Sequence, residues 1–266
     1  DEMPNNWQSF FGGSAWTYDE KTEQAYFHVF AKEQPDLNWK NPQVRQEIYK
    51  MIRWWLEFGV DGFRLDAISH IQKENWDFKI KSLKGNDPWQ PFMNVSGIEQ
   101  YMSDLKEIFD QYDALTVGEA SGVTSTEAPD WTDASSGYLN MIFELEHNVR
   151  QEGNPGHTWI YAYKKIIMQK DMLARGWNAL YLENHDQPRA ISCFGDGSMA
   201  SAKCLAVSYM LLRGTPFIYQ GQEIGMSNFP FTDIAQTDAT EIRRAYEALL
   251  AQGLTEKEAL DKVMAN

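Results

Sequence analysis

Acidic residues end three short apolar segments of this chain. Asp66 follows the letters GFRL, Glu119 follows TVG, and Asp186 follows YLENH. If these segments are neighbouring parallel strands, their carboxyl ends meet at one edge, where barrel enzymes place their catalytic groups. Two facing carboxyl groups can cleave a glycosidic bond, since one protonates the leaving oxygen while the other meets the oxocarbenium-like carbon. A gap of about 5 Å would mean retention and a wider gap inversion, and the sequence gives no distance.

The neighbours of these carboxyl groups suit that chemistry. Arg64 lies two residues before Asp66, on the same face of a strand, where it can hold the carboxylate ionised. Glu119 has no basic neighbour in the sequence, and a proton donor near neutral pH needs burial or a nearby carboxylate, which Asp186 could be. A single acidic residue after a strand is more often a cap or turn residue, but three together favour catalysis. His185, beside Asp186, is interpreted as a ligand for sugar hydroxyls.

The pattern around these residues alternates short apolar segments with amphipathic ones. Strands are predicted at 60–65, 114–118, 138–143, 178–182 and 215–219, and helices at 41–59, 97–112, 157–173 and 198–212. Strands that alternate with helices indicate parallel pairing with both faces covered, so the fold class is α/β. Residues 1–40 lack a helical period and are predicted to be loop with short strands.

A barrel is favoured over a doubly wound sheet. No glycine-rich phosphate loop follows any predicted strand, which removes the usual reason for a doubly wound nucleotide fold. Five strands are predicted, whereas a (β/α)8 barrel closes with eight. The chain is therefore expected to be a piece of a larger barrel, and residues 239–266 are expected to form two polar helices separated at Gly253.

Composition excludes several classes of function. With 24 Lys and Arg against 38 Asp and Glu, the net charge of −14 repels nucleic acid and anionic membranes. The two cysteines, Cys193 and Cys204, have neither zinc-site nor disulfide-framework spacing. No leader-like segment and no run of 18 apolar residues occurs, so a cytoplasmic location is expected.

Four stretches together resemble the glycoside hydrolases of family 13, the α-amylase superfamily, and specifically its oligo-1,6-glucosidase, dextran glucosidase and α-glucosidase branch. The stretches are 34–38, 62–68, 117–120 and 183–189. The resemblance implies a partial TIM barrel, about strands 4 to 8. Residues 1–40 would be part of an inserted, loop-rich domain B, and residues 41–266 an incomplete barrel from the third helix to just after strand 8. It implies no cofactor, although a calcium loop would lie upstream of Asp1.

The resemblance also implies roles for single residues. Asp66 would form the covalent glucosyl intermediate, Glu119 would be the general acid/base, and Asp186 would bind sugar hydroxyls and stabilise the transition state. The substrate-binding residues would be Arg64, His185, Phe11, Phe30, Gln34, Ala67 and Arg189. Members that prefer α-1,6 bonds commonly carry Val at the position of Ala67, so Ala67 favours α-1,4-linked substrates.

The leading hypothesis is a retaining, exo-acting α-glucosidase that releases glucose from maltose- or isomaltose-type oligosaccharides. The first alternative is a phospho-sugar hydrolase of the trehalose-6-phosphate type, which should show a basic cluster, but Lys40, Lys73 and Lys79 are scattered. A second alternative is a catalytically silent relative that acts as a scaffold, although such relatives usually lose a catalytic carboxylate. A third is a sugar-binding module without catalysis. The chain by itself is expected to be inactive because an unclosed barrel lacks part of its pocket.

Overall fold

The computed structural model describes residues 3–80, 88–124, 126–145 and 175–264. Within them the chain forms two compact units. The first takes the described residues up to 145 together with 175–180 and 213–215, and the second takes 181–212 and 216–264. Each unit is described separately below.

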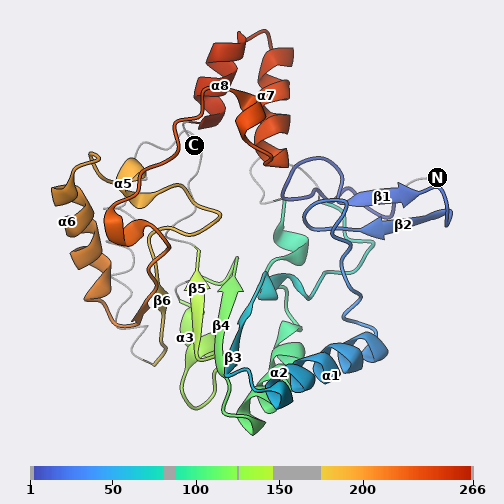
Figure 1. The fold of residues 1–266 in the computed structure, drawn as a ribbon. Coiled ribbons are helices and arrows are strands. Elements are labelled where there is room, and N and C mark those ends of the chain that lie inside the picture. The colour runs from blue at the N-terminus through green and yellow to red at the C-terminus, as the bar shows by residue number, and fades with distance from the viewer. Residues whose placement is uncertain (1–2, 81–87, 125, 146–174, 265–266) are drawn as a thin grey trace. The chain divides into compact units, whose positions relative to one another are not determined.

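A parallel sheet forms the centre of the first unit (Figure 1). Strands β3 (Gly62–Leu65), β4 (Leu115–Ala120) and β5 (Met141–Glu144) pair in sequence order, all parallel. A parallel bridge from Ile142 to Asn178 leads on to β6 (Ala179–Leu180), which neighbours β7 (Thr215–Pro216). All five predicted strands occur, the last two much shorter than expected, and the α/β class is confirmed.

Two helices pack against this sheet. Helix α1 (Pro42–Phe58) begins where the Asn41 side chain accepts a hydrogen bond from the backbone of Gln43, and it ends at Gly59, whose φ of 108° favours glycine. Helix α2 (Ile98–Gln111) buries an apolar stripe against α1 and the strands. Among the described residues between β4 and β5, the one helix is the five-residue α3 (Ala128–Thr132). The predicted helix 157–173 lies outside the described residues.

The first forty residues contain an antiparallel hairpin, β1 (Trp16–Asp19) and β2 (Gln24–Phe27), as expected of loop with short strands. Its apolar side packs around the buried residues Trp7, Phe27 and Phe92. The domain boundary at residue 40 stays a prediction.

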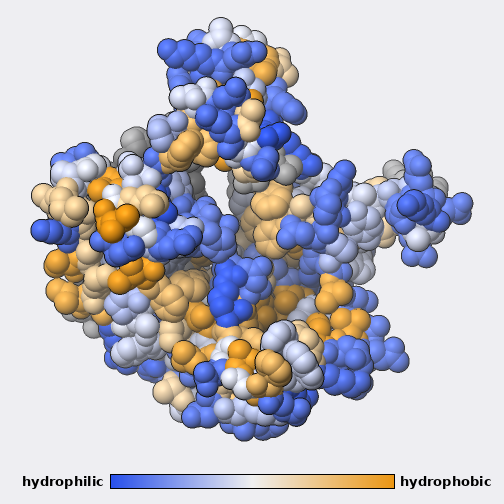
Figure 2. All heavy atoms as spheres, in the orientation of Figure 1, coloured by the Kyte–Doolittle hydropathy of each residue, from blue (hydrophilic) through white to orange (hydrophobic). Residues whose placement is uncertain are grey.

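The second unit is mainly helical. It holds α5 (Ala190–Cys193), α6 (Met199–Met210), α7 (Thr240–Ala251) and α8 (Glu256–Met264), and the last two confirm the helix pair around Gly253. Helix α6 was expected to be amphipathic but is apolar around most of its circumference, with Met199 and Val207 exposed. Figure 2 shows hydrophobic surface on the left, where α5 and α6 lie. Among the described helices, none has the length and apolar character needed to cross a membrane.

Candidate active site

The register of β3 and β4 brings two of the predicted carboxyl groups together. Leu65 pairs with Gly118, and one step further along the same register places Asp66 beside Glu119. Arg64 joins them: its Nη1 donates a hydrogen bond to Asp66 Oδ1, and its Nη2 donates to Glu119 Oε2 at 2.8 Å. One guanidinium therefore bridges the two carboxyl groups.

The backbone just after Asp66 also contacts Glu119. Ala67 has a left-handed conformation, with φ of 45°, and its N–H donates to Glu119 Oε2 at 3.3 Å. The next residues form a short turn, η1 (Ile68–His70), which packs closely against Gly118. A Cβ at Gly118 would lie 3.1 Å from Cγ2 of Ile68 and 2.5 Å from Cδ1 of Leu139, so a larger residue here would displace the Leu139 side chain.

The two carboxyl groups have different environments. The Asp66 side chain is 75% exposed and that of Glu119 only 19%. Burial raises the pKa of Glu119, the Arg64 guanidinium and the Ala67 N–H oppose this, and the negative charge of the nearby Asp66 carboxylate adds to the rise. Burial acts to lower the pKa of Arg64, but the bonds to both carboxylates outweigh it and leave that pKa raised. Two carboxyl groups in unlike surroundings suit two different roles.

The aromatic residues of the opening segment lie against the turn that follows Asp66. The Phe30 ring stands perpendicular to the His70 ring at 5.9 Å, and Phe11 lies 5.8 Å from Phe30. His70 Nδ1 is 2.7 Å from the carbonyl oxygen of Phe92, and burial lowers the pKa of His70 to about 4. The Gln34 side chain accepts a hydrogen bond from the backbone of Ala31.

A buried ion pair, which sequence reasoning missed, ties the same two segments together. Lys73 is only 8% exposed, and its Nζ lies 2.5 Å from Asp36 Oδ1. The other Asp36 oxygen accepts a hydrogen bond from the backbone of Val29 at 2.8 Å. Asp36 stands in one of the stretches that carried the family resemblance, but no sequence signal marked Lys73 as its partner. Within the described ranges, no group of three metal-ligating side chains occurs.

The third predicted carboxylate lies in the second unit. Asp186 Oδ2 is 3.2 Å from Nε2 of His185, and both side chains are exposed. The Asp186 N–H donates to the Asn184 side chain at 2.9 Å. These contacts hold the tip of the 183–186 segment in a fixed turn with both polar groups open to solvent.

Arg189, expected among the substrate-binding residues, has its guanidinium occupied by protein groups. It donates to Glu183 Oε1 at 2.8 Å and to the carbonyl oxygen of Gln220 at 2.7 Å, and it lies over the Tyr219 ring. The other Glu183 oxygen accepts from the Ala190 N–H at 2.6 Å. Glu183, to which the sequence assigned no role, is thus a buried anchor.

Comparison with known proteins gives the family of this chain. The family described as "Alpha amylase, catalytic domain" matches residues 1–259, so the chain belongs to the α-amylase catalytic-domain family. It is 46% identical, over 97% of its length, to the probable oligo-1,6-glucosidase 3 of Bacillus subtilis, and 41% identical, over 94%, to an alpha-glucosidase of Pediococcus pentosaceus. It spans about half the length of these relatives, 49% and 48%.

Superposition on solved structures supports the same family. An isomaltulose synthase from Klebsiella sp. LX3 superposes with a TM-score of 0.89 at 36% identity, with 99% of this chain and 50% of that chain covered. A trehalose-6-phosphate hydrolase from Bacillus licheniformis gives 0.87 at 34% identity, with 98% and 49% covered. The fold is therefore that of an α-amylase catalytic domain, whose structural neighbours are of the TIM-barrel type.

Proposed function

We propose that the enzyme containing this chain is a retaining, exo-acting α-glucosidase that releases glucose from short α-glucosides. The observation that carries the proposal is the shared guanidinium of Arg64, which contacts Asp66 and Glu119 at once. Inverting enzymes separate their carboxyl groups by about 6.5–9.5 Å to admit a water molecule. Two carboxyl groups held by one guanidinium suit the shorter spacing of retention.

The roles follow from exposure and charge. Asp66, exposed and paired with Arg64, is the nucleophile: its oxygen bonds the anomeric carbon while the proton of Glu119 passes to the leaving oxygen. The raised pKa of Glu119 favours the protonated form that this step needs. In the second step the Glu119 carboxylate takes a proton from water, the hydroxide oxygen bonds the anomeric carbon, and the ester to Asp66 breaks. Two inversions give net retention.

The finer assignments extend this proposal. Asp186 and His185 would bind sugar hydroxyls, for which their exposure suits them, and Phe11, Phe30 and Gln34 would line the glucose pocket. Arg189 acts better as a holder of Glu183 than as a direct ligand. The five strands β3 to β7 would correspond to strands 4 to 8 of a (β/α)8 barrel, and residues 1–40 to part of domain B.

Glu119→Gln tests the acid role, because the amide cannot donate a catalytic proton. With maltose, kcat should fall about 10²- to 10⁴-fold in the longer enzyme that contains this chain. With p-nitrophenyl glucoside the rate of the first step should fall much less, because nitrophenolate leaves without protonation. Equal losses on both substrates would contradict the assignment.

The control for Glu119→Gln is a comparison of its unfolding midpoint with that of the wild type. Because the folded-state pKa of Glu119 is raised, ionisation of this group destabilises the fold as the pH rises through that pKa. Glu119→Gln cannot ionise, so at pH 7 its unfolding midpoint should equal or exceed that of the wild type. A lower midpoint would mean that inactivity reflects unfolding.

A phosphorylated disaccharide is the alternative substrate, favoured by the likeness to trehalose-6-phosphate hydrolases, one of which, from Bacillus subtilis, is 36% identical. The buried Lys73 is already paired with Asp36 and would not serve a phosphate. Comparing kcat/KM for maltose with that for trehalose 6-phosphate separates the two, and a preference for the phosphorylated sugar would replace the proposal above.

A further inference from the structure

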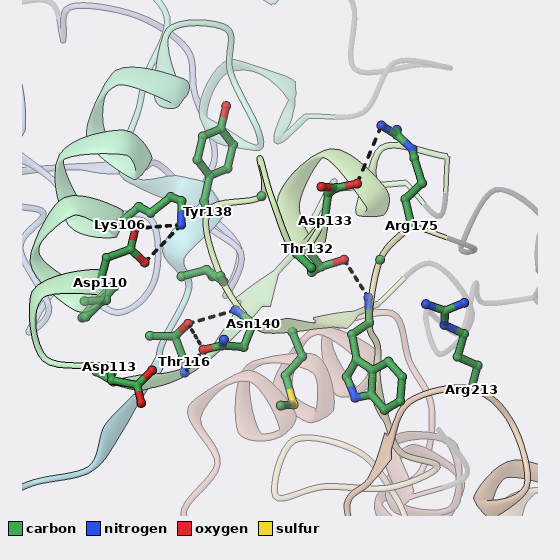
Figure 3. Close-up of a pocket in the computed structure, with 18 residues that line it drawn as sticks. Lys106, Asp110, Asp113, Thr116, Thr132, Asp133, Tyr138, Asn140, Arg175 and Arg213 are labelled. Carbon is green, nitrogen blue, oxygen red and sulfur yellow. Dashed lines mark hydrogen bonds and ion pairs between the residues drawn. The ribbon is translucent and has the colours of Figure 1, made fainter.

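A cavity of about 540 Å³ opens in the first unit (Figure 3). Neither Asp66 nor Glu119 is among its lining residues. Its lining comes from the segments that enter the strands: Thr116 near the start of β4, Asn140 just before β5, and Trp177 before β6. Thr116 and Glu119 are three residues apart on β4 and therefore face opposite sides of the sheet. The cavity and the catalytic carboxyl groups thus cannot share one ligand.

The short connection between β4 and β5 explains why the space is open. A helix that crosses over between parallel strands usually covers the sheet face along several turns, but α3 has five residues. Among the described residues, no helix therefore covers the sheet face beside the last turn of α2. The volume falls within the roughly 300–1,000 Å³ of small-ligand sites.

The charges of the lining balance. Three basic residues, Lys106, Arg175 and Arg213, face three acidic ones, Asp110, Asp113 and Asp133. Lys106 pairs with Asp110 at 2.9 Å, and Arg175 lies 3.9 Å from Asp133. The two remaining charged residues, Asp113 and Arg213, have opposite signs. The cavity therefore presents no net charge and gives no advantage to an anionic or cationic ligand.

Several polar groups of this cavity have no partner in the part of the chain that the structure describes. These are the Asp113 carboxylate, the Arg213 guanidinium, which only stacks at 5.7 Å over the Trp177 ring, and the Tyr138 hydroxyl. Asn140 uses its side-chain oxygen on Thr116 and keeps its NH2 group for a ligand. Together they offer an acceptor, three donor groups and two aromatic rings.

We propose that this cavity is a second, non-catalytic binding site for a neutral sugar of the glucose or maltose type. Hydroxyl groups are both donors and acceptors and match a lining of carboxylate, amide and guanidinium. The apolar face of a pyranose ring matches the exposed ring of Trp177, beside which the half-buried Tyr138 also lines the cavity. The site lies on the far side of the sheet and needs no turnover, so the inference does not depend on the proposed hydrolysis.

Saturation-transfer NMR with maltose tests this site, with Asp66→Ala in every sample to prevent hydrolysis. Trp177→Ala should weaken the maltose affinity of the second site at least tenfold. Trp55→Ala is the matched control: Trp55 is also 42% exposed but lies on α1, away from the cavity. Trp55→Ala should leave maltose binding unchanged. Thermal melting curves of Trp177→Ala and Trp55→Ala check that both variants are folded.

A second variant guards against misfolding of the first, because the indole N–H of Trp177 also donates a hydrogen bond to the Thr215 hydroxyl. Arg213→Gln removes a cation that has no ion pair among the described residues, and it too should weaken binding. The inference is overturned if Trp177→Ala and Arg213→Gln both bind maltose like the parent, or if Trp55→Ala loses binding equally. Displacement of maltose by inorganic phosphate alone would also overturn it, since a neutral site does not select an anion. Catalysis by the Asp66-containing enzyme should persist in Trp177→Ala, which keeps the two proposals separable.

Discussion

Arg64 is the residue on which both carboxyl groups of the candidate site depend. Its guanidinium acts to lower the pKa of Glu119, against burial and the Asp66 carboxylate, which raise it. In Arg64→Gln the opposing charge is gone, so the pKa of Glu119 should rise further. The alkaline limb of the kcat/KM profile, which reports loss of the acid's proton in the free enzyme, should therefore move to higher pH.

The pH profile of Lys50→Gln serves as the comparison, because Lys50 forms an exposed pair with Glu47 on α1, where little change is expected. An alkaline limb of Arg64→Gln that stays in place or moves to lower pH would show that the guanidinium does not act on Glu119.

Ala67 is the second residue whose conformation bears on function. Its left-handed φ of 45° is unfavourable for a β-branched side chain, and its methyl group is small. Ala67→Val should shift the ratio of kcat/KM for maltose over isomaltose towards isomaltose, by roughly tenfold to 200-fold for a methyl-scale change worth 1–3 kcal/mol. Ala67→Gly, which relieves the backbone strain without adding bulk, should not shift it towards isomaltose. A ratio that moves the other way in the Val variant would remove Ala67 from the specificity-determining residues.

At the scale of elements, the Lys73–Asp36 pair fastens the opening segment to the chain that follows η1. Burial lowers the pKa of Lys73, and Asp36 offsets this. Asp36→Ala should lower the free energy of unfolding by about 3–5 kcal/mol, because it leaves a buried ammonium without its partner. The double variant Asp36→Asn/Lys73→Met removes both charges and should recover much of that loss. Urea unfolding measures both, and additive losses in the double variant would contradict a buried pair.

The sequence predicted the positions of the helices and strands better than the strand lengths and the tertiary contacts. Helix α1 was predictable because Asn41, Pro42 and Gly59 mark its ends and its apolar residues recur at helical spacing. The strand positions followed from short apolar runs, but β6 and β7 are only two residues each, since strand length depends on partners far away in the sequence. The closeness of Asp66 and Glu119 rested on parallel pairing and was predictable. The contact from Arg64 to Glu119, the Lys73–Asp36 pair and the anchor role of Glu183 need tertiary contacts that no local pattern encodes.

At the scale of the whole molecule, this chain exposes apolar side chains on helices of ordinary length. On α6 and directly after it, Val207 and Leu211 are exposed, Leu211 by 81%, while Leu205 on the same helix is buried at 5%. Contiguous exposed apolar surface, such as Figure 2 shows on the left, is typical of contact sites for other protein or ligand surfaces. The folded 266-residue chain should therefore bind an environment-sensitive apolar dye.

The variants Leu211→Ala and Leu205→Ala compare the truncation of an exposed leucine with that of a buried one. Leu211→Ala should reduce the dye signal and change the free energy of unfolding by no more than about 0.5 kcal/mol, because a solvent-exposed side chain loses few contacts. Leu205→Ala should cost about 2–5 kcal/mol, as truncation of a buried leucine does, and should not reduce the signal from folded protein. Dye fluorescence and urea unfolding of the two variants measure this contrast. Equal destabilisation by both would mean that Leu211 is covered in solution, and that α6 packs against protein along its full circumference, as a helix apolar on all sides is expected to do.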